Sequence, residues 1–205
     1  MSRAKSDQTF IAKPFLKAGA AFCAIEYDLI PNVKMSDIVT QCRRAITWIF
    51  FNAKKFNIDT NKIFLSGHSA GGHLVSILMS TDWSLILDRN YRPFKGGCAV
   101  SGLFELEPVQ LCYVQDILNL SDSDVLEFSP IRFEQVPKEP LIIAVGSDES
   151  SEFIRQSFDF SNSWSERGAL CSYFKVAGCN HFNILNTLAD PSSNLTNKII
   201  DQMGI

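Results

Sequence analysis

The stretch Ile63-Phe64-Leu65-Ser66-Gly67-His68-Ser69-Ala70-Gly71-Gly72-His73-Leu74 decides the fold of this chain. Its first part is an apolar run of strand length, its last part opens an amphipathic helix, and a Gly-x-Ser-x-Gly motif centred on Ser69 lies between them. This order of strand, tight turn and helix exposes a serine side chain at the edge of an α/β sheet. Flanking glycines suit it, because the strained turn needs neighbours without bulk. The stretch therefore predicts Ser69 as a nucleophile.

The rest of the chain alternates apolar runs of strand length with helical periodicity. This pattern is typical of an α/β fold with a mostly parallel sheet and helices on both faces. The chain has 205 residues and no evident linker, so we expect one domain over residues 1–205. Residues 82–94 and 106–140 are the least regular and are expected to hold insertions or substrate-covering loops. Strands are expected at residues 20–27, 62–66, 97–101, 141–145 and 172–177, and helices at residues 36–56, 70–80, 152–167 and 183–189.

The composition excludes several classes of partner. A net charge of −3 without a long basic cluster argues against nucleic acid. The apolar runs are far shorter than the roughly 20 residues that a membrane span needs, so no membrane partner is expected. The six cysteines form no Cys-x-x-Cys pair and no secretion signal opens the chain, which favours the reducing cytosol over a disulfide framework. A homodimer is left open.

A nucleophilic serine needs a general base, and the chain has three histidines. His68 is adjacent to Ser69 on the turn, so its ring cannot easily reach the serine hydroxyl, and His73 lies one helical turn further on, facing another side. His181 follows the last expected strand in a glycine-containing loop, where α/β sheets place their working residues. His181 is therefore the predicted base.

The third member of the site is expected to be an acid between Ser69 and His181 in the chain. Asp148 comes just past the end of the apolar run at residues 141–145 and is the predicted acid, orienting the His181 ring and stabilising its charged form. Glu149 is its rival, and Glu152 is less suited because it is expected on the following helix.

The sequence around these residues resembles that of the kynurenine formamidase (arylformamidase) family of the α/β-hydrolase superfamily. The resemblance implies hydrolysis of N-formyl-L-kynurenine to formate and L-kynurenine in tryptophan breakdown, without metal or organic cofactor. It implies that Ser69 attacks the formyl carbon, that His181 moves the proton while Asp148 holds it, and that water clears a formyl-Ser69 intermediate. The matching segments, in order, are YDL at residues 27–29, GHSAGGHL at 67–74, SGLFELEP at 101–108, FSP at 128–130, VGSDE at 145–149 and NHF at 180–182.

One family feature is missing from the sequence. Family members carry a His-Gly-Gly run upstream of the first helix that forms half of the oxyanion hole, and this chain has none. The backbone N–H of Ala70 is the one donor we assign, and losing the other costs about 10² to 10³ in rate. We therefore expect a domain that lacks the N-terminal strands and is N-terminally truncated. Three explanations stay open: a truncated gene model or isoform, which we favour, a natural inactive relative, and an enzyme with a replacement donor.

Two further functions remain as alternatives. The GHSAGG run is shared with many esterases, so a carboxylesterase of broader acyl specificity fits as well. The missing run also permits a catalytically impaired fragment that acts as a binding partner. For an aryl formamide substrate, Phe104, Tyr113 and Phe182 are candidates to line a ring pocket, although most of the 16 phenylalanines are expected in the core.

Overall fold

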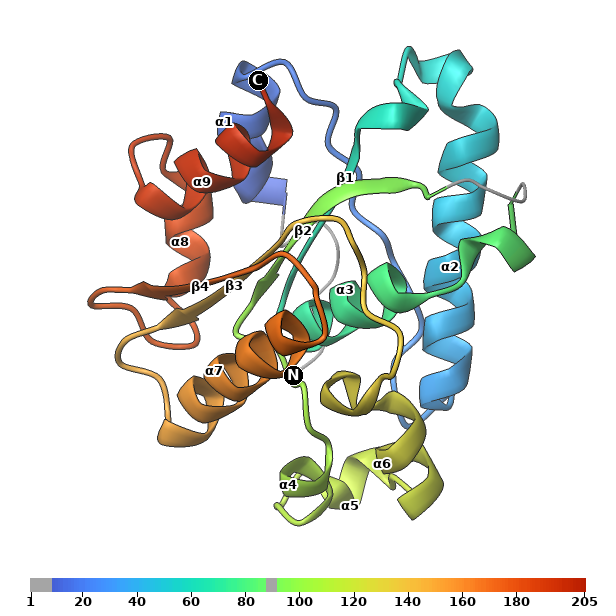
Figure 1. The fold of residues 1–205 in the computed structure, drawn as a ribbon, viewed down its shortest axis with the longest axis vertical. Coiled ribbons are helices and arrows are strands. Elements are labelled where there is room, and N and C mark those ends of the chain that lie inside the picture. The colour runs from blue at the N-terminus through green and yellow to red at the C-terminus, as the bar shows by residue number, and fades with distance from the viewer. Residues whose placement is uncertain (1–8, 88–91) are drawn as a thin grey trace.

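A parallel sheet organises the computed structural model, which describes residues 9–87 and 92–205 (Figure 1). Within these residues the sheet has four strands in the order β1-β2-β3-β4, and all three pairings are parallel. The prediction of an α/β fold with a parallel sheet is confirmed, and four of the five expected strands form within a few residues of their expected bounds. The strands are β1 (Ile63–His68), β2 (Phe94–Val100), β3 (Leu141–Gly146) and β4 (Cys171–Val176).

The fifth expected strand, at residues 20–27, is wrong. The segment has no regular secondary structure and alternates between exposed and half-buried residues. A strand needs a neighbour for its backbone N–H and C=O groups, and in the described residues β1 pairs with β2 alone. The segment instead runs as an irregular chain whose Ile25 and Tyr27 pack against the core. The apolar composition therefore reflects partial packing against the core here, not a strand.

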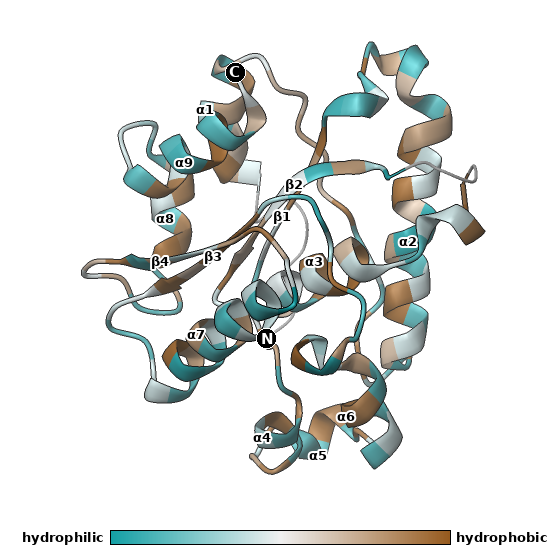
Figure 2. Cartoon of the chain, in the orientation of Figure 1, coloured by the Kyte–Doolittle hydropathy of each residue, from teal (hydrophilic) through white to brown (hydrophobic). Residues whose placement is uncertain are grey.

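Helices cover both faces of the sheet, as predicted (Figures 1 and 2). One face carries α2, α3 and α7 over a core that includes Ile143, Phe104 and Trp164. The other face carries α1, α8 and α9 over Val100, Ala144 and related side chains. Their bounds are α1 (Ala12–Lys17), α2 (Met35–Asn52), α3 (Ala70–Ser80), α7 (Ser151–Glu166), α8 (Ile184–Ala189) and α9 (Asn194–Met203).

The expected helices are confirmed near their expected bounds, and the local sequence explains their ends. The helix expected at residues 36–56 is α2 followed by a 3-10 turn, η2 (Ala53–Phe56). Asn57 ends it in the left-handed conformation, which asparagine tolerates better than most residues. A second turn, η3 (Thr60–Lys62), leads into β1. Helix α7 begins after Ser150, whose hydroxyl accepts the N–H of Phe153 as an N-cap.

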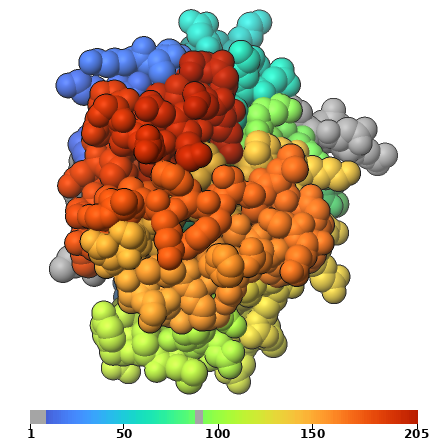
Figure 3. Space-filling model, turned by 60° about the vertical axis from the view of Figure 1, so that its left-hand side comes forward, coloured from blue at the N-terminus to red at the C-terminus, as the bar shows by residue number. Residues whose placement is uncertain are grey.

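The two segments read as least regular hold short helices. Residues 82–94 contain η4 (Trp83–Leu85), with residues 88–91 outside the described part. The later segment contains α4 (Glu107–Gln110), α5 (Gln115–Leu118), α6 (Asp122–Phe128) and η5 (Pro130–Arg132). A capping box at Ser121 starts α6, and the helix buries Val125 and Phe128. In the space-filling view, the α4–α5 part of this segment (lime green) lies beneath α7 (orange) (Figure 3).

Candidate active site

Ser69 occupies a strained turn between the end of β1 and the start of α3. Its φ of 57° and ψ of −118° lie in a region that non-glycine residues rarely adopt, and its N–H donates to the Val100 carbonyl of β2 at 2.9 Å. A Cβ on Gly67 would lie 2.2 Å from the backbone oxygen of Gly71, so position 67 requires glycine. A Cβ on Gly71 would meet nothing within 4 Å. The bulk restriction inferred for both flanking glycines therefore holds at Gly67 and not at Gly71.

His181 lies against Ser69 in the loop that follows β4. Its Nε2 is 3.0 Å from the Ser69 hydroxyl, and its Nδ1 is 2.8 Å from a carboxylate oxygen of Glu149. A carboxylate accepts only, so Nδ1 carries the proton and Nε2 offers its lone pair to the serine hydroxyl. The His181 side chain is 21% exposed, whereas that of Glu149 is 0% exposed. A buried acid, a partly buried base and a partly exposed hydroxyl are thus connected by consecutive hydrogen bonds.

The predicted acid, Asp148, is not part of this chain of hydrogen bonds. Its side chain is exposed and accepts a bond from the Ser147 hydroxyl at 2.7 Å. The turn after β3 folds back, with the Glu149 N–H directed to the Gly146 carbonyl at 3.3 Å, and this points residue 149 inward. The rival acid weighed in the sequence, Glu149, is the one that contacts His181.

Residue 148 instead contributes its backbone. The Asp148 N–H donates to the Cys179 carbonyl at 2.9 Å, and the Ser147 hydroxyl accepts the Gly178 N–H at 2.8 Å. A Cβ on Gly146 would lie 2.1 Å from that same Cys179 oxygen. The glycine thus lets the loop that carries His181 approach the end of β3, which brings acid and base together.

Three donors satisfy the buried Glu149 carboxylate. The Ser101 hydroxyl donates to Oε1 at 2.5 Å, the Gly146 N–H donates to the same oxygen at 2.8 Å, and His181 holds Oε2. Burial alone would raise the pKa of Glu149, but the hydrogen bonds from His181, Ser101 and Gly146 together bring it below its usual value. Glu149 therefore stays ionised, as a group that orients and stabilises a charged imidazole must.

The other two histidines have partners of their own. His73 is 2% exposed, and its Nε2 donates to the Phe128 carbonyl at 2.6 Å. Burial lowers the pKa of His73 to about 4, so its ring is neutral at physiological pH. The Nε2 of His68 donates to the backbone carbonyl of His181 at 2.8 Å. Neither ring contacts the Ser69 hydroxyl through these bonds, in agreement with their elimination as the base.

The backbone N–H of Ala70, predicted as an oxyanion donor, is the first of helix α3. The first four N–H groups of a helix lack partners within it, and Ala70 is exposed. The N–H therefore lies beside Ser69 at the positive end of the helix, where a developing negative charge is favoured.

The candidate aromatic residues separate clearly. Phe104 is 0% exposed and stacks on Phe160 at 4.0 Å, so it belongs to the core. Tyr113 is 87% exposed on the turn between α4 and α5. Phe182 is 66% exposed, and its ring lies edge-on to His181, with 5.6 Å between the ring centroids.

One aromatic residue beside the base was not predicted from the sequence. The ring centroid of Phe153 lies 4.4 Å from that of His181. Its position in the first turn of α7, just past the acid, was the available signal.

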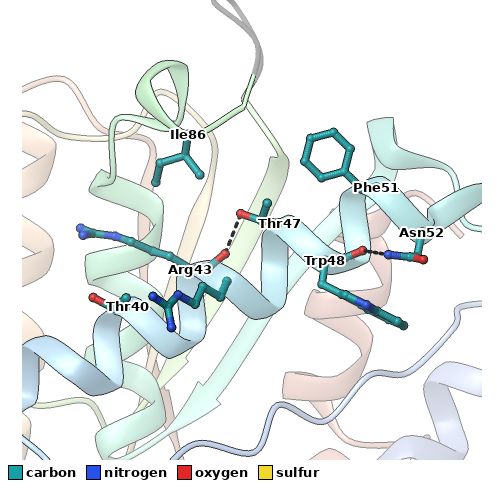
Figure 4. A pocket seen from close by; sticks show the side chains of 8 residues that line it. Thr40, Arg43, Thr47, Trp48, Phe51, Asn52 and Ile86 are labelled. Carbon is teal, nitrogen blue, oxygen red and sulfur yellow. Dashed lines mark hydrogen bonds between the residues drawn. The ribbon is translucent and has the colours of Figure 1, made fainter.

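A hollow on the outer face of α2 lies away from these residues (Figure 4). Three of its polar side chains have partners: Thr47 and Asn52 each donate to a carbonyl of their own helix at 2.9 Å, and the Nε of Arg43 donates to the Thr81 hydroxyl at 3.2 Å. None of its lining residues belongs to the Ser69–His181–Glu149 chain. They are Thr40, Arg43, Arg44, Thr47, Trp48, Phe51, Asn52 and Ile86.

Two further classes of feature are absent from the part of the chain that the structure describes. Residues 9–87 and 92–205 contain no group of three or more His, Cys, Asp or Glu side chains placed to hold a metal ion. Over the same residues, no helix is long and apolar enough to span a bilayer.

Comparison with known proteins identifies relatives over nearly the whole chain. The family model BD-FAE matches residues 1–105. The kynurenine formamidase of Salmo salar is 31% identical over 209 residues, covering 98% of this chain and 68% of that protein. The kynurenine formamidase of Danio rerio is 30% identical over 206 residues, with the same coverage of 98% and 68%. A solved structure of a thioesterase candidate from Silicibacter sp. TM1040 matches with a TM-score of 0.83 and 25% identity, covering 100% of this chain and 72% of that one.

Proposed function

Because this chain belongs to the kynurenine formamidase family of α/β-hydrolases, we propose that it is a serine hydrolase that cleaves N-formyl-L-kynurenine to L-kynurenine and formate. One observation carries the proposal: the continuous chain of hydrogen bonds from Glu149 through His181 to the Ser69 hydroxyl. A nucleophile, a base and an orienting acid within bonding distance are the parts that acyl transfer requires.

The first half of the reaction transfers the formyl group to the enzyme. The Ser69 oxygen attacks the formyl carbon while its proton passes to Nε2 of His181, and Glu149 stabilises the resulting imidazolium. The negative charge that develops on the formyl oxygen faces the Ala70 N–H at the start of α3. The tetrahedral intermediate then breaks its C–N bond, and His181 returns the proton to the leaving aniline nitrogen. Kynurenine departs and formyl-Ser69 remains.

The second half repeats the steps with water. A water molecule gives its proton to His181 and attacks the formyl carbon, and the C–O bond to Ser69 breaks as His181 reprotonates the serine. Formate leaves and the free enzyme is restored. The exposed Phe182 ring beside His181 supports an aryl substrate, because it offers an apolar face within reach of the reacting groups.

The test compares formate release from N-formyl-L-kynurenine by the purified chain and by Ser69→Ala. We expect the variant to lose roughly 10³-fold or more in kcat, since the nucleophile is removed. Equal formate release by the two proteins would contradict the proposal. Circular dichroism of both proteins shows whether a loss of activity reflects a loss of fold.

A carboxylesterase of broader specificity is the second candidate, favoured by the GHSAGG run. Turnover of a short acyl ester at a higher kcat/KM than the formamide would establish it. A catalytically impaired fragment is the third, and failure of a fluorophosphonate probe to label Ser69 in the folded chain would favour it over both enzymes.

A further inference from the structure

His68 links the turn that carries the nucleophile to the loop that carries the base. It is the residue before Ser69, and its Nε2 lies 2.8 Å from the backbone oxygen of His181, 113 residues later in the chain. A carbonyl only accepts, so the Nε2 of His68 carries the proton of this bond. The two imidazole rings also contact each other, with centroids 4.6 Å apart and planes inclined by 42°.

The bond acts on the residue whose placement matters most. The His181 ring must keep Nε2 near the serine hydroxyl and Nδ1 near Glu149 at the same time, and both contacts depend on where the main chain of residue 181 lies. Other bonds reach this loop from the turn after β3, through the Asp148 N–H and Ser147, and bonds between Asn180 and Asn183 hold it internally. His68 holds it from the nucleophile side, so base and nucleophile move together.

We infer that His68 is a positioning residue, which fixes the general base against the nucleophile through the hydrogen bond from its Nε2 to the His181 carbonyl. The inference rests on the proposed function for its kinetic consequence, and its geometry stands independently. A displacement of about 1 Å at a reacting group costs up to about 10² in rate, so the expected effect of losing the bond falls on kcat.

Two substitutions separate the bond from the ring. His68→Phe keeps a planar ring of similar volume and removes the donor, whereas His68→Gln removes the ring and keeps an N–H donor at a similar reach. We expect His68→Phe to lose about 10- to 100-fold in kcat with KM within about twofold. His68→Gln is expected to recover most of that loss. Equal losses in the two variants, or wild-type kcat in His68→Phe, would overturn the inference.

The rate at which a fluorophosphonate probe labels Ser69 makes the same comparison without the proposed substrate. Labelling requires an activated serine and no formamide, so the order wild type, His68→Gln, His68→Phe is expected here too. If the wild type is labelled but releases no formate from N-formyl-L-kynurenine, the proposed substrate fails while this order still decides the role of His68. Labelling at one rate in all three proteins would count against it.

Proton NMR gives a readout that needs no activity at all. The His181 Nδ1 proton that faces Glu149 is expected as a low-field signal, assigned by its loss in Glu149→Gln. The inference predicts the signal in the wild type and in His68→Gln, and its broadening or loss in a His68→Phe protein that melts at a similar temperature. An unchanged signal in His68→Phe would show that the carbonyl bond does not position the base.

Discussion

The turn after β3 and the outer face of α2 differ in the burial and the hydrogen bonding of their side chains. At the turn, the Glu149 carboxylate is fully buried and accepts three hydrogen bonds. On α2, Trp48 and Phe51 are 55% and 70% exposed beside a hollow in which Thr47 and Asn52 bond to carbonyls of their own helix (Figure 4). A buried ionised group with every oxygen partnered costs free energy to assemble, whereas an open hollow on a helix does not. The proposed reacting groups therefore lie where polar groups are buried and paired, and not at the hollow on α2.

Among the substitutions in these two regions, removing the charge of Glu149 is expected to have the largest effect on kcat. Glu149→Gln keeps the shape of the side chain but cannot stabilise a charged His181, so kcat for N-formyl-L-kynurenine should fall by roughly 10³- to 10⁴-fold. Steady-state kinetics measures the loss. The adjacent Asp148→Asn is the matched control and should stay within about threefold, because its side chain is exposed. A loss in Asp148→Asn as large as that in Glu149→Gln would return the acid role to residue 148.

Acid should destabilise the protein through His73, the buried ring beneath the nucleophile turn. Its folded pKa of about 4 lies below its ordinary value of 6.5, so between these values the unfolded chain binds more protons than the folded one. The contribution of His73 to the free energy of unfolding is therefore fully present above pH 6.5. This contribution falls by about 3 kcal/mol as the pH drops to 4. His73→Gln keeps an N–H donor and does not titrate. Urea unfolding over this pH range should give a flatter dependence for the variant, and equal slopes would refute the account.

Glu149 adds a second acid-sensitive contribution at lower pH. Its folded pKa is depressed, so its stabilisation is present above the ordinary pKa of 4.5 and is lost as the pH falls through the lower folded value. His73→Gln should therefore still lose stability below about pH 4.5. Adding Glu149→Gln to that variant should reduce this remaining loss of stability.

Ser101 tests whether a single partner of the buried carboxylate matters. Ser101→Ala removes the donor to Glu149, and kcat is expected to fall by roughly 10- to 100-fold, since a hydrogen bond to a charged group contributes about 1.5 to 3 kcal/mol. Ser101 has a positive φ of 50°. Ser101→Gly relieves that conformation and removes the same donor, so both variants should lose activity alike. Wild-type kcat in Ser101→Gly would show that the donor is dispensable.

Changes on the outer face of α2 should have the smallest effect. Phe51→Ser and Trp48→Ala alter exposed rings that contact none of the reacting groups, so kcat/KM is expected to stay within about twofold and stability within about 0.5 kcal/mol. A tenfold rise in KM in either variant would mean that the hollow binds the substrate, and the contrast drawn above would not hold.

Much of the fold followed from local patterns in the sequence. The segments that form β1 to β4 are mostly apolar and alternate with helical segments along the chain. Helix α3 begins and ends at the residues that its periodicity indicated. Residues 20–27 have the same apolar character, but a strand forms only if another strand supplies its hydrogen bonds. That information lies in the tertiary arrangement and not in the segment.

The candidate site shows a similar division. Ser69 and His181 could be located because the motif, the order along the chain and the small number of histidines left few choices. Asp148 and Glu149 could not be separated, because both follow β3 and a tight turn points adjacent side chains in opposite directions. The deciding residue was Gly146, where the Cys179 carbonyl approaches too closely for any side chain and closes the turn around residue 149.

The position of β1 at an edge of the described sheet affects the mobility of the turn that carries Ser69. Among the described residues β1 bonds to β2 on one side, while β2 and β3 are each bonded on both. Backbone amides at a sheet edge open more readily than those in its middle, so β1 should exchange its amide hydrogens with solvent faster than its two inner neighbours. Ser69 therefore follows one of the two edge strands of the described sheet, and the persistence of the Ser69–His181 geometry depends on the contacts that tie its turn to Val100 and to the His181 loop.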